Sequence, residues 1–179
     1  MNNLWLQDQN LFVETYGGLY EHSDWIAGQA WQELDAEFNA SPGNTREIDV
    51  EGLLTAMAAV VEGAGREPQL NLICAHPDLA GKAAVSGELT EHSTEEQSRA
   101  RLDQCSAEEY AKFQQLNTEY KKKFGFPFIL AVRNRTRHEI LEAFNSRIEN
   151  TADEEFKLAL DNIHQIARLR LEASLLIQD

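Results

Sequence analysis

Short motifs that start α-helices recur through the second half of the sequence. In each motif a hydroxyl residue precedes a glutamate by three positions, and the pairs are Ser93/Glu96, Ser106/Glu109, Thr136/Glu139 and Thr151/Glu154. In such a capping box each side chain accepts a hydrogen bond from the backbone amide of the other residue. Apolar residues at helical spacing follow each box. The motifs therefore predict that this half of the chain is mainly α-helical.

The rest of the chain carries the same helical periodicity. The predicted helices cover Asn10–Leu34 with a weak point at Gly17-Gly18, Val50–Ala64, Pro68 to no further than His76, the segments after Ser93, Ser106 and Thr136, and Ala152–Leu176. Ser23 and Asp49 are expected N-caps, and Gly65 and Gly125 are expected stops. The clearest predicted loop is Asn39–Glu47, which contains the turn sequence Ser-Pro-Gly-Asn.

One segment, Phe126–Val132, has the composition of a β-strand. No second segment of this kind offers a partner, and a lone strand leaves its backbone polar groups unsatisfied. We interpret it as an extended, partly buried connector whose free N–H and C=O groups are available to a ligand. The alternative is an ordinary buried connection between helices. The predicted fold is all-α, with one compact multi-helix domain over residues 1–179 and a core of about residues 10–177.

The size and charge of the chain narrow its function. It has 179 residues, of which 42% are hydrophobic and 26% charged, so an ordinary buried core is expected. The net charge of −14 argues against nucleic acid as a partner, because phosphate binding needs a basic field. A small anionic ligand would need a local positive group to offset the repulsion. No apolar run reaches the ~18 residues that span a bilayer, so no membrane partner is expected.

Cellular location and thiol chemistry follow from the same residues. The N-terminal sequence MNNLWLQDQN lacks a basic region followed by an apolar one, so we expect a cytoplasmic location. Cys74 and Cys105 do not make a disulfide framework in a chain of this size. Cys74 lies in the apolar run LNLICA, and we expect its thiol to be buried and inert.

The first candidate for proton transfer is His76, which follows an apolar run and directly precedes Pro77. Pro77 disfavours helical geometry in the residue before it, so His76 should lie at the end of a helix on a fixed backbone. Histidine can take up or release a proton near neutral pH. A packed core histidine is the alternative interpretation.

The second candidate is Ser93–Gln97, with the sequence STEEQ, at the predicted start of the next helix. A helix start offers N–H groups to an anion, and Glu96 and Gln97 add a carboxylate and an amide. The alternative is purely structural, because Glu96 is also the glutamate of a capping box.

The third candidate is Arg170, which shares a line of the last predicted helix with the apolar residues Phe156 and Ile163. An arginine on such a line needs a carboxylate partner, either from a ligand or from an internal salt bridge. Arg168 falls on the polar side of the helix and is expected to be solvated. Arg170 is therefore a candidate for the local positive group that an anionic ligand requires.

Familiar metal and nucleotide motifs do not occur in the sequence. The acidic and histidine residues around the first two candidates are His76, Asp78, Glu91, His92 and Glu95. Their spacing matches no metal-binding motif, so no metal site is predicted. The chain also lacks GxSxG, Walker and GxGxxG sequences, so these motifs give no indication of a hydrolase, a nucleotidase or a dinucleotide-dependent enzyme.

Together, these segments resemble the 2-oxo-4-hydroxy-4-carboxy-5-ureidoimidazoline (OHCU) decarboxylase family. The matching segments are FVETYGGLYEHSDW from Phe12, AHPDLAGKAAVSGELTEHSTEEQ from Ala75, LNTEYKKKFGFPFILAV from Leu116 and IARLRL from Ile166. The resemblance covers most of the chain from about residue 10, and the combination of AHPDL, SxxEQ and FGFPFI is specific. One departure is Ser23-Asp24-Trp25, where the family usually has Ser-Pro-Trp.

The resemblance implies an all-α homodimeric enzyme without cofactor or metal. Its implied reaction converts OHCU, a small anionic ureidoimidazoline, to (S)-allantoin in urate degradation. It also implies that His76 is the catalytic proton donor and Glu96 its partner at the substrate. The substrate-binding set it implies is Pro77, Ser93, Thr94, Glu95, Glu96, Gln97, the main chain of Phe128, Ile129, Leu130, Ala131 and Val132, and Arg170. Two alternatives remain, a non-catalytic helical binding module and a helical scaffold for a neighbouring enzyme of purine catabolism.

Overall fold

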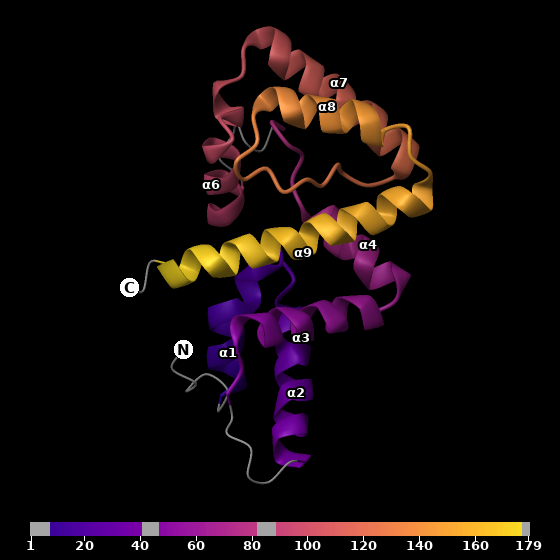
Figure 1. Cartoon of the computed structure of the whole chain (residues 1–179). Helices are drawn as coiled ribbons and strands as arrows, with labels where there is room; N and C mark the ends of the chain where they lie inside the picture. The colour runs from indigo at the N-terminus through magenta and orange to yellow at the C-terminus, as the bar shows by residue number, and fades with distance from the viewer. Residues whose placement is uncertain (1–7, 41–46, 82–88, 177–179) are drawn as a thin grey trace. The chain divides into compact units, whose positions relative to one another are not determined.

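A computed structural model describes residues 8–40, 47–81 and 89–176 (Figure 1). These residues form eight α-helices and two short 3-10 helices, and they contain no β-strand. The elements are α1 Gln9–Tyr16, η2 Gly17–Leu19, α2 Asp24–Ala40, α3 Val50–Gly63, α4 Arg66–Ala75, α6 Glu91–Arg99, η3 Leu102–Gln104, α7 Ala107–Phe124, α8 Arg137–Arg147 and α9 Ala152–Leu176. The all-α class predicted from the sequence is confirmed.

The chain divides into two compact units. Unit 1 contains Met1–Ala75 and Ile166–Asp179, and unit 2 contains His76–Gln165. Helix α9 therefore contributes its first part to unit 2 and its last part to unit 1. The two units are described separately below. The organisation as a single domain over 1–179 stays a prediction.

Three of the four predicted capping boxes are present. At Ser106, Thr136 and Thr151 the backbone N–H donates to the glutamate three residues on, at 2.9, 2.6 and 2.9 Å. The hydroxyl oxygen of each accepts from the amide of that glutamate in return. Gly125 then ends α7 with φ of 81°, a left-handed conformation that glycine adopts without a steric penalty.

The fourth predicted box, at Ser93, is wrong. Helix α6 begins at Glu91, and Thr90 is its N-cap, with Oγ1 accepting from the N–H of Ser93 at 3.3 Å. Thr90 is also a hydroxyl residue, and it lies three positions ahead of the polar Ser93. The helix therefore begins at the earlier of the two hydroxyl residues. Ser93 is thus inside the first turn and Glu96 in the second. Helix capping therefore does not explain the position of Glu96.

Unit 1 forms its core from α1, α2 and α3, with α1 packed on α2 and α2 on α3. Phe12, Ile26, Leu53 and Met57 are fully buried between them. The predicted break after α1 is present as η2, and Asp49 caps α3 as predicted. Helix α2 continues to Ala40, beyond the predicted end at Leu34. Residues 41–46 of the predicted loop lie outside the described residues.

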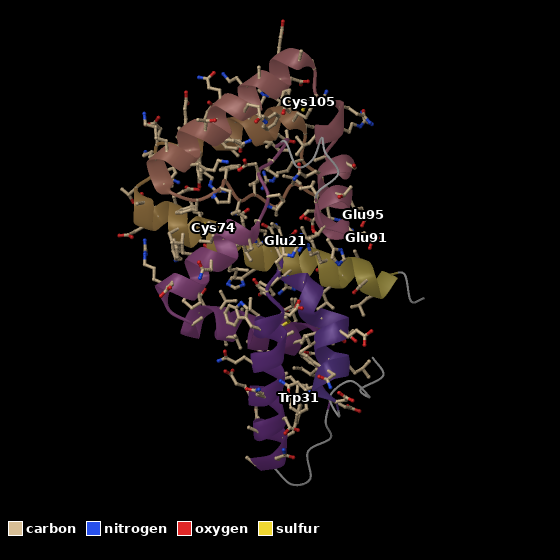
Figure 2. All side chains as sticks on the ribbon, turned by 180° about the vertical axis from the view of Figure 1, so that it is seen from behind. Glu21, Trp31, Cys74, Glu91, Glu95 and Cys105 are labelled. Carbon is tan, nitrogen blue, oxygen red and sulfur yellow. The ribbon has the colours of Figure 1, made fainter. Side chains whose placement is uncertain are left out.

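The prediction that the Cys74 thiol is buried is wrong. Its side chain is exposed rather than buried, and Figure 2 labels it on α4. Helix α4 buries Leu72 and Ile73, and the next position along the helix turns away from that face. Partial burial still raises the pKa of the Cys74 thiol above its usual value.

Unit 2 is built around the segment that follows α7. Residues Phe126–Val132 are extended and buried, as predicted, and lead from α7 to α8. We call this segment the connector. Nη1 of Arg147 on α8 donates to the carbonyl of Ile129 at 2.7 Å, and Oδ1 of Asn162 on α9 accepts from the amide of Ala131 at 3.1 Å. The connector is therefore bonded to α8, which follows it, and to α9.

A buried carboxylate holds the helices of unit 2 together. Glu155 on α9 is fully buried and accepts hydrogen bonds from the Tyr120 hydroxyl, the Arg147 guanidinium and the Asn150 amide. The guanidinium of Arg147 also lies 4.5 Å from the centre of the Phe128 ring. We call these four polar side chains the Glu155 network. Burial and the neighbouring Glu155 raise the pKa of the Tyr120 hydroxyl, so it remains a proton donor in this network.

None of the helices in the described ranges combines the length and the apolar character that crossing a membrane requires.

The capping boxes predict a loss of stability in acid. Hydrogen bonds from the capping residues lower the pKa of Glu109, Glu139 and Glu154 below 4.5, the ordinary value. A lowered folded-state pKa contributes stability above the unfolded pKa, and this stability is lost as pH falls through the folded pKa. We expect the triple Glu→Gln variant at these positions to lose less stability than the native chain between pH 7 and pH 3. Urea denaturation at both pH values measures the difference.

A matched control removes three exposed carboxylates outside the boxes, by Glu14→Gln, Glu37→Gln and Glu149→Gln. Both triple variants change the net charge equally, so they share any effect of overall repulsion. If both lose the same stability in acid, the capping boxes are not the source of the pH dependence.

Candidate active site

His76 occupies the place that the sequence predicted for it. Helix α4 ends at Ala75, and His76 is the first residue of unit 2 with only 7% of its surface exposed. Pro77 explains this end, because its ring disfavours helical geometry at His76. A tight turn, Asp78–Gly81, then follows, in which the amide of Gly81 donates to the carbonyl of Asp78 at 3.3 Å.

Helix α6 is bonded directly to the turn that follows His76. Oε1 of Gln97 accepts from the N–H of Ala80 at 3.0 Å, and Nε2 of the same amide donates to the carbonyl of Asp78 at 3.3 Å. Ser93 and Gln97 are buried one helical turn apart on α6, and Glu96 lies next to Gln97 with intermediate exposure. The structure thus brings the predicted residues Ser93, Glu96 and Gln97 to one side of α6, and Gln97 bonds to the backbone that follows His76.

Thr94 and Glu95 belong to the predicted substrate-binding set but lie on the exposed side of α6. The Thr94 hydroxyl donates to the carbonyl of Thr90 at 2.9 Å, and Figure 2 shows Glu95 beside Glu91, one helical turn earlier. The helical period separates both from the buried Ser93 and Gln97. Their role at a substrate stays a prediction.

The connector supplies fewer available backbone groups than expected. All of Phe128–Val132 is buried, which suits a site wall. The expectation of free groups is wrong for the Ile129 carbonyl and the Ala131 amide, which bond to Arg147 and Asn162. It is also wrong for the Ala131 carbonyl, which accepts from Nε of Arg135 at 3.0 Å. Polar side chains from α8, α9 and the turn before α8 satisfy backbone groups that a sheet would otherwise satisfy.

Arg170 lies in unit 1 and pairs there with a carboxylate. Nη2 donates to Oε2 of Glu21 at 2.8 Å, and both residues are buried, with exposures of 4% and 3%. Nη1 also approaches the carbonyls of Gly18 and Leu19 at 3.4 Å. The prediction of a buried arginine with a carboxylate partner is confirmed, and the partner observed is internal. Its contact with a substrate stays a prediction.

Glu21 was not predicted from the sequence. Only the need of Arg170 for a carboxylate pointed to such a residue, and no spacing motif links positions this far apart. Arg168 is partly exposed and pairs with the exposed Glu51, so its predicted place on the polar side of α9 is confirmed. This pair raises the pKa of Arg168 and lowers that of Glu51.

The arrangement in unit 2 is suited to proton transfer. A buried histidine lies at the end of an element, and a carboxylate lies on the helix bonded to the next turn. Histidine titrates near neutral pH, and a carboxylate partner sets its orientation and charge. The described residues contain no group of three or more His, Cys, Asp or Glu side chains arranged to hold a metal ion. The described residues thus form an all-helical protein in which a buried histidine is followed by a turn that is bonded to the helix of Glu96.

Comparison with known proteins gives the family of this all-helical chain. A family model described as OHCU decarboxylase matches residues 6–172. The chain belongs to the OHCU decarboxylase family. An OHCU decarboxylase of Haloferax volcanii is 40% identical over 164 residues, covering 92% of this chain and 89% of that protein. The uric acid degradation bifunctional protein PucL of Bacillus subtilis is 37% identical over 171 residues, covering 96% of this chain and 32% of that protein.

Solved structures share the fold. A crystal structure of (S)-allantoin synthase superposes with a TM-score of 0.69 and 34% identity, covering 94% of this chain and 51% of the other. A crystal structure of OHCU decarboxylase in the presence of (S)-allantoin gives 0.59 and 25%, covering 82% of this chain and 92% of the other. The family resemblance found in the sequence motifs is therefore confirmed.

The buried pair in unit 1 predicts a strong stability effect. Arg170→Met leaves the Glu21 carboxylate buried without its cation, and breaking a buried pair from one side costs about 3–5 kcal/mol. We expect a loss of this order in the free energy of unfolding, measured in urea. Adding Glu21→Gln to this variant should recover part of the loss, because the uncompensated charge is then gone.

The control is Arg168→Met on the same helix, which removes an exposed pair and should change stability little. Equal stability of the Arg168 and Arg170 variants would contradict a structural role for the Arg170–Glu21 pair.

Proposed function

We propose that the chain decarboxylates OHCU and so produces (S)-allantoin in urate degradation. The observation that carries this proposal is His76, a buried histidine whose following turn is bonded to the helix of Glu96, in a chain of the OHCU decarboxylase family. The relatives and structures described above carry names that include this substrate or this product.

The substrate has the electronic features that decarboxylation needs. Its carboxylate is attached to C4, which also carries a hydroxyl group and is bonded to C5, the carbon of the imidazoline C=N bond. When the bond to the carboxylate breaks, CO2 leaves and the electron pair enters this conjugated ring. The pair forms a C4–C5 double bond while the ring nitrogen of the former C=N bond takes up a proton. A proton then adds to C5, the carbon that carries the ureido group, while the C4 hydroxyl loses its proton and becomes a carbonyl, so the net change is exchange of CO2 for H. Delivery of the proton to one face of the planar intermediate gives a single enantiomer.

We propose that His76 supplies the proton and that Glu96 orients the imidazole. A protonated His76 near the hydroxyl oxygen on the ring would also stabilise negative charge as that charge moves from the carboxylate into the ring. Pro77, Ser93 and the connector would form the walls around the substrate. Glu96 lies in the second turn of α6 rather than in a capping box, so its carboxylate is not needed to cap the helix. This position supports the proposed role of Glu96 at His76.

We also propose a homodimer and a cytoplasmic location. Resemblance to the family supports the dimer. Light scattering on the purified chain measures its mass against the 20.3 kDa of one copy. Fractionation of the source cells tests the location.

His76→Asn should abolish most of the activity. Loss of a general acid lowers a rate by about 100-fold or more, so (S)-allantoin should form at little above the spontaneous rate. The assay mixes the enzyme with fresh urate-oxidation product and its hydrolase, and circular dichroism distinguishes (S)-allantoin from the racemic background. His138→Asn is the control, since His138 is exposed on α8.

An unchanged rate in His76→Asn would refute the role of His76. A native chain that binds the substrate but forms allantoin only at the background rate would instead indicate a binding module. Failure to bind as well would favour the scaffold.

Glu96→Gln tests the carboxylate by itself. If Glu96 orients the imidazole of His76 and stabilises its protonated form, this variant should lower kcat by about 10-fold or more and shift the pH dependence of kcat. Glu91→Gln is the control because it removes the same charge from the exposed side of α6. Equal pH profiles for the two variants would leave Glu96 without a catalytic role.

A further inference from the structure

The turn after His76 has a backbone that is not stable by itself. Ala80 has φ of 48°, in the left-handed region that non-glycine residues rarely adopt. A Cβ at Gly81 would lie 2.8 Å from Cβ of Asp78, so only glycine fits there. Backbone of this kind is strained and persists only where its surroundings hold it in place.

Three side chains of α7 bind this turn, and each of them contacts a different residue of the turn. Nε2 of Gln114 donates to the carbonyl of Ala80 at 2.8 Å, and Nδ2 of Asn117 donates to the carbonyl of Leu79 at 2.9 Å. Nζ of Lys121 pairs with Oδ2 of Asp78 at 2.6 Å. The spacing of three and four residues places all three on one face of α7. The helix therefore binds the turn residue by residue.

Gln97 of α6 completes the set from a second helix. Its amide bonds to the N–H of Ala80 and to the carbonyl of Asp78. Gln97, Gln114 and Asn117 together bind four backbone polar groups within three consecutive residues. We call these three amide side chains the turn clamp.

Stability alone does not account for the turn clamp. Asn117 is 3% exposed, and its buried Oδ1 accepts no hydrogen bond from the described residues. An unsatisfied buried acceptor costs at least as much free energy as a typical hydrogen bond, such as the one from Nδ2 to Leu79, contributes. The net gain from this buried amide is small or negative. Its clear effect is to fix the position of the Leu79 carbonyl.

Pro77 passes this fixed geometry to His76. Its ring locks its own φ and also restricts the backbone of the preceding residue. Only this rigid residue separates His76 from the clamped turn. The direction of the His76 side chain from its backbone is therefore set by the turn.

We propose that Gln114 and Asn117, with Gln97, are positioning residues that fix the imidazole of His76 through the turn. Gln114 and Asn117 act on the backbone of the turn and not on the substrate, so they determine the rate of the proton step more than substrate affinity. The expectation for activity rests on the proposed decarboxylase function, whereas the expectation for the geometry of His76 does not.

Gln114→Met tests the proposal against the control Gln115→Met. The change keeps the side-chain length, and Gln115 is exposed on the same helix, where it bonds only to Glu119. Displacing a reacting group by about 1 Å costs up to ~100-fold in rate. We expect kcat to fall by about 10- to 100-fold in Gln114→Met with KM nearly unchanged, and neither constant to change in Gln115→Met.

A spectroscopic readout tests the geometry without the reaction. The chain has five histidines, so the imidazole signals of His76 can be assigned in NMR spectra by their loss in His76→Asn. In Gln114→Met these signals should shift and their titration midpoint should move, while Gln115→Met should match the native chain. Asn117→Asp, which keeps the size and removes the donor, should act like Gln114→Met.

Unchanged His76 signals in both Gln114→Met and Asn117→Asp, with native circular dichroism, would overturn the proposal. If the native chain has no decarboxylase activity but the His76 signals respond, the proposed function fails and the positioning role stands. A fall in kcat accompanied by an equal loss of folded protein would also overturn the proposal, because the clamp would then be structural.

Discussion

The architecture of unit 2 depends on burying the Glu155 carboxylate with all of its partners. Moving a carboxylate out of water costs several kcal/mol, and only a full set of hydrogen bonds offsets this. The donors come from Tyr120 on α7, Arg147 on α8 and Asn150 after α8. The network can form only when three helices are in place together, so it specifies their arrangement more than it adds stability. Arg147 then extends the network to the Ile129 carbonyl, and this allows an extended segment to lie inside an all-α unit without a sheet.

Helix α7 links this network to the candidate site. Tyr120 belongs to the Glu155 network, and Asn117 and Lys121 on either side of it in sequence bind the turn after His76. A rotation of α7 that broke the buried hydrogen bond of Tyr120 would also displace these contacts. With the proposed positioning role, the geometry of His76 depends on a carboxylate that belongs to the helix packing and takes no part in the proposed chemistry. Distant packing residues can affect a reaction by this route, because a rigid helix transmits the displacement.

Features with local causes were predictable from the sequence, and features with distant causes were not. The bounds of α9, the caps at Asp49, Ser106 and Thr136, and the stop at Gly125 depend on neighbours within about one helical turn. Helical periodicity also placed Arg170 on a buried line. The partner Glu21 and the Glu155 network involve residues far apart in the chain, which no local spacing encodes. The predicted start of α6 was wrong because two hydroxyl residues, Thr90 and Ser93, could each cap the helix. Motif matching alone does not decide between them.

The charges around the candidate site bear on the protonation state that His76 needs. The chain carries −14 overall, so an anionic substrate requires local positive charge. Arg147 and Arg170 are largely removed from solvent, and each is paired with a buried carboxylate, so each pair is formally neutral. Such a pair still offers N–H donors but adds little net attraction for an anion. A protonated His76 would supply both the missing charge and the proton that replaces CO2. Binding and catalysis would then require the same protonation state, and Glu96 would favour that state by stabilising the imidazolium.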